Sequence, residues 1–314
     1  MFHGMDYVYE VYKERSFSKA ARNLYISQPA LSSSIKRIEE GIGAPIFDRS
    51  TSPVKLTECG ERYIQAVEQI YGIQQTFVNF LTDTQEMNSG CLSIGGTNML
   101  SSYILPPLIS EYKSRFPNID VSLVEESHSK LETLMMNGSL DFILDYDRFS
   151  GDTFESYAYM QEHLMLAVPA QFEINKSLYA WRLSLENILS ETYLEDRYPE
   201  VPLNVFKNEP FILLKPGNDT YQRAILLCRN HGFTPHTILT LEQQITAYNM
   251  ACAGIGVTYI SDTLAKNIMP NPNIVYYKLD EAISRRNIYL YYKRNRYINR
   301  IMQEFLKLMQ QLYR

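Results

Sequence analysis

Long apolar runs are missing from this sequence of 314 residues, and their absence excludes membrane-spanning helices. No stretch reaches the roughly 18 apolar residues that such a helix needs. The chain comes to the charged Asp6 and Glu10 without an apolar signal region before them. We therefore expect a cytoplasmic protein with no membrane partner.

Cysteine is scarce, and the motifs of common catalytic sites are absent. The four cysteines, Cys59, Cys91, Cys228 and Cys252, form no C-x-x-C pair, so neither a zinc site nor a disulfide framework is predicted. The five histidines form no pair with metal-ligand spacing. No G-x-S-x-G, H-E-x-x-H or phosphate-binding glycine motif occurs either. We therefore expect a protein that is not an enzyme and needs no metal or cofactor.

An excess of basic charge is also lacking, although nucleic-acid affinity comes largely from Lys and Arg. The net charge is -5, and the first 60 residues carry eight Lys or Arg against seven Asp or Glu. Composition alone gives no indication of DNA binding. The local pattern near the N-terminus does.

Three short helices are predicted in the first forty residues. Residues 5–12 form the first, and residues 19–24 form the second with Ser18 as its N-cap. The third runs from residue 28 to about residue 40, and Ser27 can cap it. Two helices joined by a three-residue turn are typical of a helix-turn-helix.

The third helix has an apolar side and a polar side, because residues three and four apart lie on the same face. The apolar arc consists of Leu31, Ile35, Ile38 and Ile42. The polar arc consists of Gln28, Pro29, Ser32, Ser33 and Lys36. Glutamine can pair with adenine and serine with a base or a phosphate, so the polar arc suits the major groove.

A short β-wing is predicted after the third helix. Two apolar runs, residues 44–49 and 54–57, flank the turn of residues 50–53, which is rich in Ser and Pro. Arg49 lies near the base of this wing, where its side chain could enter the minor groove or hold a phosphate.

Together these residues resemble the DNA-binding domain of the LysR family in order and spacing. The motifs are Ser16-Phe17-Ser18-Lys19-Ala20-Ala21, Leu24, Ile26-Ser27-Gln28-Pro29-Ala30-Leu31-Ser32, Ile35, Glu39-Glu40, Gly43, Phe47-Asp48-Arg49 and Leu56-Thr57-Glu58-Cys59-Gly60. The resemblance implies a sequence-specific bacterial transcription regulator that binds double-stranded promoter DNA. The DNA-binding positions that it implies are Ser18, Lys19, Gln28, Pro29, Ser32, Ser33, Lys36, Arg37 and Arg49.

The chain departs from the family pattern at three places. Members usually carry Arg at the position of Ser33, a long polar side chain at that of Ser34, and basic residues in the wing where this chain has Ser52-Pro53. Fewer phosphate contacts are then available. We expect DNA binding with a shallower salt dependence than is usual for the family.

A long helix is predicted from Thr57, its N-cap, to about residues 85–86. Apolar residues at alternating spacings of four and three indicate a coiled-coil seam with one polar break at Gln74. The alternative is an amphipathic helix that lies on its own domain. The family comparison favours a dimerisation helix, and hence a homodimer or homotetramer. Its dimerisation residues would be Tyr63, Val67, Ile70, Phe77 and Leu81.

From Cys91 onward strands alternate with helices, which indicates parallel sheets flanked by helices. This part resembles the LysR effector domain, which is similar in fold to periplasmic solute-binding proteins. The supporting motifs are Leu92-Ser93-Ile94-Gly95, Leu105-Pro106-Pro107-Leu108-Ile109, Phe116-Pro117-Asn118-Ile119, Gly138-Ser139-Leu140-Asp141-Phe142-Ile143 and Ala253-Gly254-Ile255-Gly256-Val257.

The predicted fold class is therefore an α+β multidomain protein. A winged helix-turn-helix in residues 1–58 precedes a linker and dimerisation helix in residues 59–89. Residues 90–314 form a two-lobed α/β effector-binding domain. Its first lobe covers about residues 90–161 and 267–314, and its second about residues 162–266.

The resemblance implies a small-molecule effector in the cleft between the lobes, at the carboxyl ends of strands and the starts of helices. We expect an anionic or zwitterionic metabolite. The candidate effector-binding residues are Thr97, Asn98, Ser101, Ser102, Ser127, His128, Tyr146, Thr220 and Gln243.

Two alternatives remain open. The DNA-binding regulator could sense oxidants through Cys228 and Cys252 instead of binding a metabolite. The chain could also be a cytoplasmic metabolite-binding protein that does not bind DNA. In the favoured interpretation the oligomer binds an interrupted dyad upstream of a promoter and contacts RNA polymerase.

Overall fold

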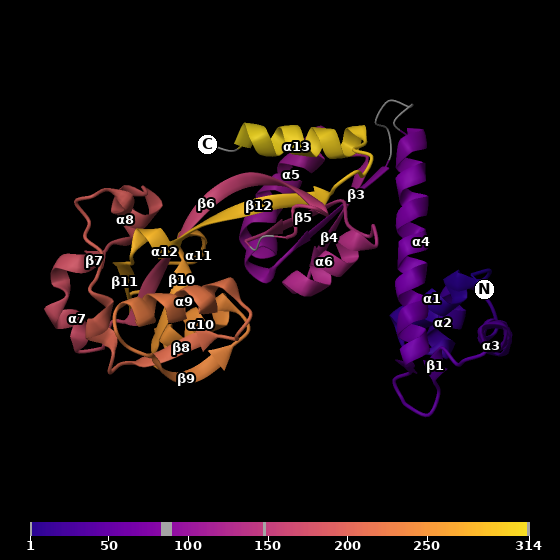
Figure 1. Cartoon of the computed structure of the whole chain (residues 1–314), viewed down its shortest axis with the longest axis horizontal. Helices are drawn as coiled ribbons and strands as arrows, with labels where there is room; N and C mark the ends of the chain where they lie inside the picture. Colours follow the sequence, from indigo (N-terminus) through magenta and orange to yellow (C-terminus); the bar gives the residue numbers. More distant parts are fainter. Residues whose placement is uncertain (1, 83–89, 147–148, 313–314) are drawn as a thin grey trace. The chain divides into compact units, whose positions relative to one another are not determined.

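The computed structural model describes residues 2–82, 90–146 and 149–312. Contacts divide the chain into two compact units: Met1–Glu86 with Thr133–Leu140, and Met87–Glu132 with Asp141–Arg314. The ribbon of the chain is drawn in Figure 1.

The first unit contains a small winged helix. Its elements are α1 (Met5–Glu14), α2 (Phe17–Asn23), α3 (Gln28–Ile42), β1 (Phe47–Asp48), β2 (Lys55–Leu56) and α4 (Glu58–Thr82). The two wing strands pair antiparallel, with Phe47 opposite Leu56. Val11, Leu31 and Ile35 are fully buried at the centre of this core. The predicted helix-turn-helix and wing are thus present with their apolar faces turned inward.

Two hydroxyl residues cap the helices of the helix-turn-helix, and one of them differs from the prediction. Ser27 caps α3, because its Oγ accepts from the backbone N–H of Ala30 at 3.3 Å. The prediction of Ser18 as the cap of α2 was wrong. Ser16 has the extended backbone of an N-cap, and its Oγ accepts from the N–H of Lys19 at 3.4 Å.

Thr57 caps α4 as predicted, since the N–H of Gly60 donates to its Oγ1 at 3.0 Å. The prediction that Tyr63 and Val67 belong to the dimerisation seam was wrong. Tyr63 and Val67 are buried in the winged-helix core, so these side chains pack within their own chain. Ile70 is half-buried and Phe77 is 60 % exposed, while the side chain of Leu81 lies outside the described residues.

The second unit is built on two sheets that share one long strand. The first sheet has the order β4 (Ile119–Glu125), β3 (Gly90–Gly96), β5 (Phe142–Asp145), β12 (Arg285–Lys293) and β6 (Phe154–Pro169). Strands β3, β4 and β5 are parallel, and β12 runs antiparallel to β5 and β6. Figure 1 shows α5 (Leu105–Arg115) and α13 (Arg300–Leu312) over one face and α6 (His128–Met136) over the other. The short η1 (Leu100–Ile104) leads into α5.

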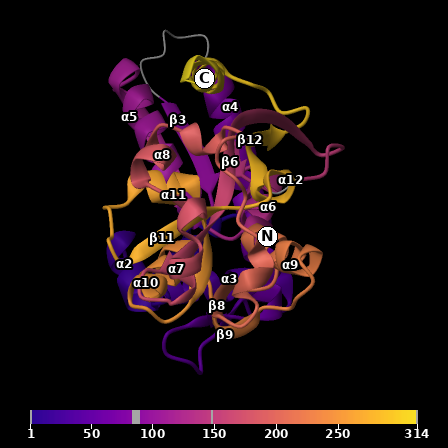
Figure 2. The same cartoon turned by 90° about the vertical axis from the view of Figure 1, so that its left-hand side faces the viewer.

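The second sheet uses the last third of β6. It adds β10 (Val257–Ser261), β8 (Pro210–Leu214), β9 (His236–Leu241), β11 (Ile274–Lys278) and β7 (Arg182–Leu183). Figure 2 shows α9 (Asp219–Asn230) and α10 (Gln244–Cys252) on opposite sides of β8. The other elements of this lobe are α7 (Ile174–Ser177), η2 (Tyr179–Trp181), α8 (Leu185–Leu189), η3 (Thr192–Leu194), η4 (Leu203–Phe206), α11 (Asp262–Asn267) and α12 (Glu281–Ser284).

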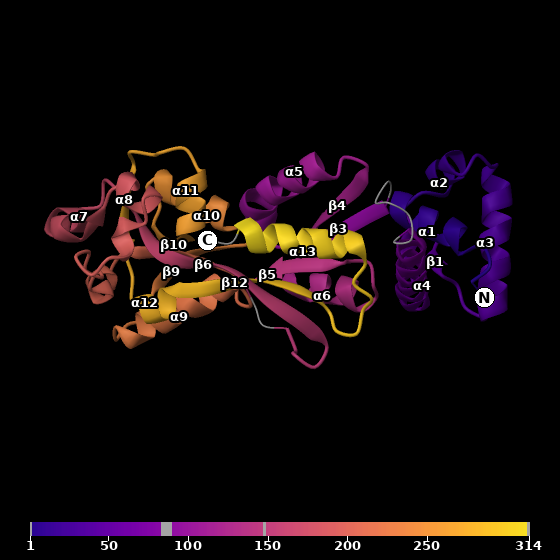
Figure 3. The same ribbon diagram turned by 90° about the horizontal axis from the view of Figure 1, so that it is seen from above.

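The chain leaves the first lobe along β6 and returns to it along β12. These two strands run side by side in Figure 3. His163 on β6 pairs with Arg285 at the start of β12. The predicted return at residue 267 was too early, because β11 pairs with β6 and β7 in the second sheet. Residues 274–278 therefore lie in the second lobe and not in the first.

Candidate ligand cavity and nucleic-acid interface

A cavity of about 540 Å³ lies between the two lobes of the second unit. From the first lobe its wall takes the residues that follow β3, β4 and β5. From the second lobe it takes the residues that follow β8 and β9, and β12 adds Arg286. The carboxyl ends of parallel strands are the usual ligand position in α/β sheets, and this volume is ordinary for a small-molecule site.

Seven of the nine predicted effector residues line this cavity: Thr97, Asn98, Ser127, His128, Tyr146, Thr220 and Gln243. The other two do not. Ser101 is buried in η1 and packs against Gly96, since a Cβ added to Gly96 would lie 2.9 Å from the Ser101 Oγ. Ser102 is exposed, but it does not line the cavity. The structure thus brings seven of these side chains together, while their binding of a ligand stays a prediction.

Seven charged residues of the wall were not among the predicted effector residues: Glu125, Glu126, Asp145, Lys215, Asp219, Glu242 and Arg286. Most of them stand at or just after strand ends, as Thr97 does, so the same positional argument could have found them. Arg286 could not be found in this way. It lies on β12, whose pairing joins segments more than 120 residues apart in the chain.

Arg286 is the centre of a buried ion network behind the cavity. Its Nε donates to Glu162 at 2.7 Å, and its Nη1 donates to Asp219 at 2.7 Å and to the Thr220 Oγ1 at 3.0 Å. The Tyr146 ring covers the guanidinium at 3.7 Å. Burial by itself would lower the pKa of Arg286. The raising effect of Glu162, Tyr146 and Asp219 is larger, so the pKa of Arg286 lies above its usual value.

Asp219 begins α9 and joins this network to the second lobe. Burial would raise its pKa, but Arg286 and Arg223 outweigh burial and hold the pKa of Asp219 below its usual range. The Nε of Arg223 donates to both carboxylate oxygens of Asp219, at 2.8 and 3.0 Å. Asp219 is therefore a carboxylate at neutral pH and is bound by two guanidinium groups.

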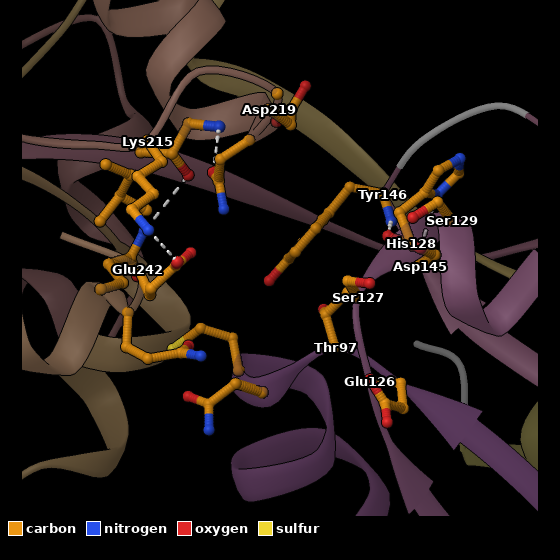
Figure 4. A pocket seen from close by; sticks show the side chains of 18 of the residues that line it. Thr97, Glu126, Ser127, His128, Ser129, Asp145, Tyr146, Lys215, Asp219 and Glu242 are labelled. Atoms are coloured by element: carbon orange, nitrogen blue, oxygen red, sulfur yellow. Dashed lines mark hydrogen bonds and ion pairs between the residues drawn. The ribbon is translucent and has the colours of Figure 1, made fainter. Parts of the chain in front are cut away.

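The other polar groups of the wall also form pairs, as Figure 4 shows. Lys215 and Glu242 form an ion pair on one side of the cavity. On the other side, the Nδ1 of His128 lies 2.9 Å from the Oδ2 of Asp145. The side chain of Tyr146 reaches between the two sides. The lobes thus present preformed polar groups to whatever occupies the cavity.

The thiols of the second unit have the wrong environment for a redox sensor. Burial raises the pKa of Cys228 to about 11, and its Sγ lies 3.1 Å from the hydroxyl of Tyr259. Burial also raises the pKa of Cys252 and of Cys91. Reactive thiols need a lowered pKa and access to solvent, and Cys228 is fully buried.

Within residues 2–82, 90–146 and 149–312, no group of three or more His, Cys, Asp or Glu side chains could hold a metal ion. In the same part of the chain, no helix combines the length and apolar character that crossing a membrane requires.

The polar side of α3 is accessible within the winged helix. Leu31 and Ile35 are fully buried, while the opposite positions Gln28, Ser33 and Lys36 are exposed. The remaining predicted DNA-binding residues outside the wing are also accessible: Ser18, Lys19, Pro29 and Arg37 are exposed, and Ser32 is half-buried. This arrangement leaves one face of α3 available to a groove of DNA.

Arg49 is held at the base of the wing. Its Nη1 donates to the Ser32 Oγ at 3.0 Å, and its Nη2 lies 2.9 Å from the Glu39 Oε2. Its guanidinium carbon also lies 5.0 Å from the centre of the Phe17 ring. Ser32 therefore positions Arg49 beside α3, which the sequence analysis did not foresee.

Comparison with known protein families assigns both halves of the chain. Residues 2–61 match the model described as "Bacterial regulatory helix-turn-helix protein, lysR family", and residues 85–314 match the model "LysR substrate binding domain". The chain is 31% identical over 310 residues to "Uncharacterized HTH-type transcriptional regulator YcgK" of Bacillus subtilis (strain 168), covering 97% of this chain and 92% of that protein. It is 24% identical over 302 residues to "HTH-type transcriptional regulator AlsR" of the same organism, covering 96% of this chain and 93% of that protein.

Solved structures with the same fold extend over the whole chain. The crystal structure of CbnR, a LysR family transcriptional regulator, has a TM-score of 0.71 at 16% identity and covers 100% of this chain and 99% of that chain. A full-length OxyR variant from Pseudomonas aeruginosa has a TM-score of 0.67 at 18% identity, with 98% and 96% covered. The predicted fold class is confirmed: a winged helix-turn-helix precedes an α/β domain of two lobes.

Proposed function

The chain belongs to the LysR family of bacterial transcriptional regulators, and from this premise we propose how its two units divide the work. The winged helix-turn-helix binds a specific site in promoter DNA, and the C-terminal domain binds a small effector in its interlobe cavity. The proposal for DNA binding is supported by the accessible polar face of α3, beside which Ser32 and Glu39 hold Arg49.

On DNA, α3 enters the major groove. Gln28, exposed at the first position of the helix, pairs with a base edge, and adenine offers it a bidentate partner. Lys36 and Arg37 reach phosphates, as do Ser18 and Lys19 at the start of α2. Arg49 contacts the DNA backbone or the minor groove from the wing.

The chain acts as a homodimer or homotetramer. Supporting this, α4 carries an exposed apolar stripe above the winged-helix core, with Ile73 71 % and Phe77 60 % exposed. Together with Ile70 these residues have the spacing of a helix–helix seam. A dimer places two α3 helices on the two halves of an interrupted dyad, and the oligomer then contacts RNA polymerase.

In the C-terminal domain we assign the effector an anionic or zwitterionic character, because the starts of α6 and α10 border the cavity. Closure of the lobes on the effector shifts the balance between two arrangements of the regulator. A ligand can do this only if it binds the two arrangements with different affinity. The effector domain thus binds a signal, and we assign it no catalytic step.

The proposed division of the chain is residues 1–58 for DNA binding, 59–89 for the linker helix and 90–314 for effector binding. The first turns of the linker helix belong to the winged-helix core, so dimerisation falls to its later part. Because its target is the chromosome, we place the protein in the cytoplasm.

Fluorescence anisotropy tests the DNA-binding half. A labelled duplex from the region upstream of the protein's own gene is compared with a shuffled duplex at several salt concentrations. We expect about 10³-fold or more tighter binding to the upstream duplex at physiological salt. We also expect a shallower salt slope than in relatives that carry basic residues at the positions of Ser33 and Ser52-Pro53. Equal affinity for both duplexes at every salt concentration would exclude specific recognition.

A further inference from the structure

The charge of the cavity wall narrows the class of effector. We propose that the ligand carries an ammonium group, so that a small zwitterion of the amino-acid type fits the cavity and a purely anionic metabolite does not. This inference rests on the proposed effector function of the same cavity.

Carboxylates outnumber cations in the wall. Five acidic side chains line the cavity, Glu125, Glu126, Asp145, Asp219 and Glu242, against one Lys, one Arg and the imidazole of His128. An anion therefore needs a cation that is not already neutralised.

Arg286 is not such a cation. Its side chain is 2 % exposed and contacts the carboxylates of Glu162 and Asp219, the hydroxyl of Thr220 and the ring of Tyr146. An incoming carboxylate would have to displace one of these partners. Glu162 is fully buried and would be left without its cation, and Asp219 would keep only Arg223, so the exchange is unfavourable. Lys215 forms an exposed ion pair with Glu242 in the same wall. An anion can take Lys215 only by leaving Glu242 as one more carboxylate without a cation, so the exchange gains little.

Asp145 is held by the imidazole of His128, and two further wall carboxylates have no Lys or Arg partner among the described residues: Glu125 and Glu126, at the end of β4. The Glu125 Oε1 accepts from the Asn98 amide at 2.8 Å, which orients this carboxylate and leaves its charge in place. Both side chains are exposed at the cavity and can take an ammonium group without breaking an ion pair.

Thr97 gives a second and independent indication of a ligand at this position. Its Oγ1 is buried and has no hydrogen-bond partner among the described residues. Figure 4 shows Thr97 between Ser127 and Glu126 on the first-lobe side. Buried hydroxyl groups are almost always hydrogen-bonded. Because the half-buried Thr97 side chain lines the cavity, its rotation toward the cavity gives this oxygen a partner in a polar group of the ligand next to its ammonium.

Isothermal titration calorimetry on the full-length protein tests the proposal. The probes are the common L-amino acids, the 2-oxo acid and the amine that correspond to each amino acid that binds, and the dicarboxylates succinate and 2-oxoglutarate. We expect an amino acid to bind and its 2-oxo acid, which lacks the ammonium group, to bind at least about tenfold more weakly.

The double variant Glu125→Gln/Glu126→Gln should weaken binding of the amino acid about tenfold or more, because two carboxylate partners become neutral amides. The control is Asp120→Asn, which removes an exposed carboxylate at the opposite end of β4. It should leave the affinity unchanged.

Binding of dicarboxylates or 2-oxo acids without any amino acid or amine overturns the proposal, as does equal affinity in the double variant. The proposal is also overturned if no ammonium-bearing probe binds at millimolar concentration.

The variant Ser127→Trp distinguishes failure of the ammonium assignment from failure of the proposed effector site. If it abolishes binding of an anionic probe, the cavity is still the effector site and the ammonium assignment alone is wrong. Binding of the amine without its carboxylate supports the ammonium assignment and removes the anionic group from the proposed effector.

Discussion

Arg49 in the winged helix and Arg286 in the effector domain are held by the same kinds of partner, yet they differ in burial. Each contacts a carboxylate, a hydroxyl group and an aromatic ring. The Arg49 side chain is 42 % exposed, whereas that of Arg286 is 2 % exposed. An exposed ion pair is worth little and can be exchanged for a phosphate, while a buried one cannot be broken cheaply. The contacts of Arg49 therefore suit DNA binding, and those of Arg286 fix the structure where β6 and β12 connect the two lobes.

The largest expected effect follows from breaking the buried contacts of Arg286. Arg286→Met should lower the free energy of unfolding by about 3 to 5 kcal/mol, because it leaves the fully buried carboxylate of Glu162 without a cation and Asp219 with Arg223 alone. Urea unfolding followed by circular dichroism measures this loss. Adding Glu162→Leu to the variant should restore part of it. A loss below about 1 kcal/mol would mean that the network is no more than a surface ion pair.

Next in size is an effect on sequence recognition. Gln28→Ala should weaken binding to the specific site by about 1 to 3 kcal/mol and leave binding to random DNA nearly unchanged, because a base contact carries sequence information. Competition anisotropy with specific and random duplexes measures both quantities. The matched control is Gln310→Ala, on the exposed surface of α13 (Arg300–Leu312) in the effector domain. Equal losses on both duplexes would show that Gln28 contacts a phosphate.

A smaller effect is expected from the exposed contacts of Arg49. Arg49→Met should change the free energy of unfolding by less than about 1 kcal/mol, since the Arg49–Glu39 pair is exposed. It should weaken binding to specific and random DNA alike and lower the salt slope by about 1, as expected for the loss of one phosphate contact. Unchanged DNA affinity would indicate that Arg49 only supports the fold of the wing.

The smallest effect is expected from oxidants. Because burial raises the pKa of Cys228 to about 11, its thiol stays protonated from neutral pH up to nearly that value, and the thiolate forms only above it. Mild peroxide should therefore leave DNA binding unchanged, and alkylation of Cys228 should require unfolding. Mass spectrometry of alkylated peptides checks this. Rapid modification of Cys228 in the folded protein at neutral pH would restore the redox-switch alternative.

A second contrast, between local and long-range contacts, decides how much of the structure could be predicted from the sequence. The helix-turn-helix depends on local signals, such as Ser27 before Pro29 and the apolar spacing of Leu31 and Ile35, and its elements are where they were expected. The cap of α2 was misplaced because two serines, Ser16 and Ser18, flank Phe17 and both are suitable caps.

Long-range pairing explains the remaining errors. Tyr63 and Val67 lie four residues apart on one face of α4, a spacing that fits a dimer seam and a domain core equally well. Only the three-dimensional packing shows that they belong to the core. Likewise, β11 and β12 acquire their places by pairing with β6, so the lobe boundary and Arg286 were not accessible to a local pattern. The cavity residues that were predicted stand next to strand ends, which local patterns do indicate.

Nuclease footprinting on the DNA upstream of the protein's own gene tests the central claim most directly. The full-length protein is titrated in the presence of excess random competitor DNA. The account predicts protection of two half-sites related by a dyad, and loss of that protection with Gln28→Ala at a protein concentration where random DNA is still bound. No specific protection at any salt concentration would contradict the account and leave the chain as a metabolite-binding protein without a specific DNA site.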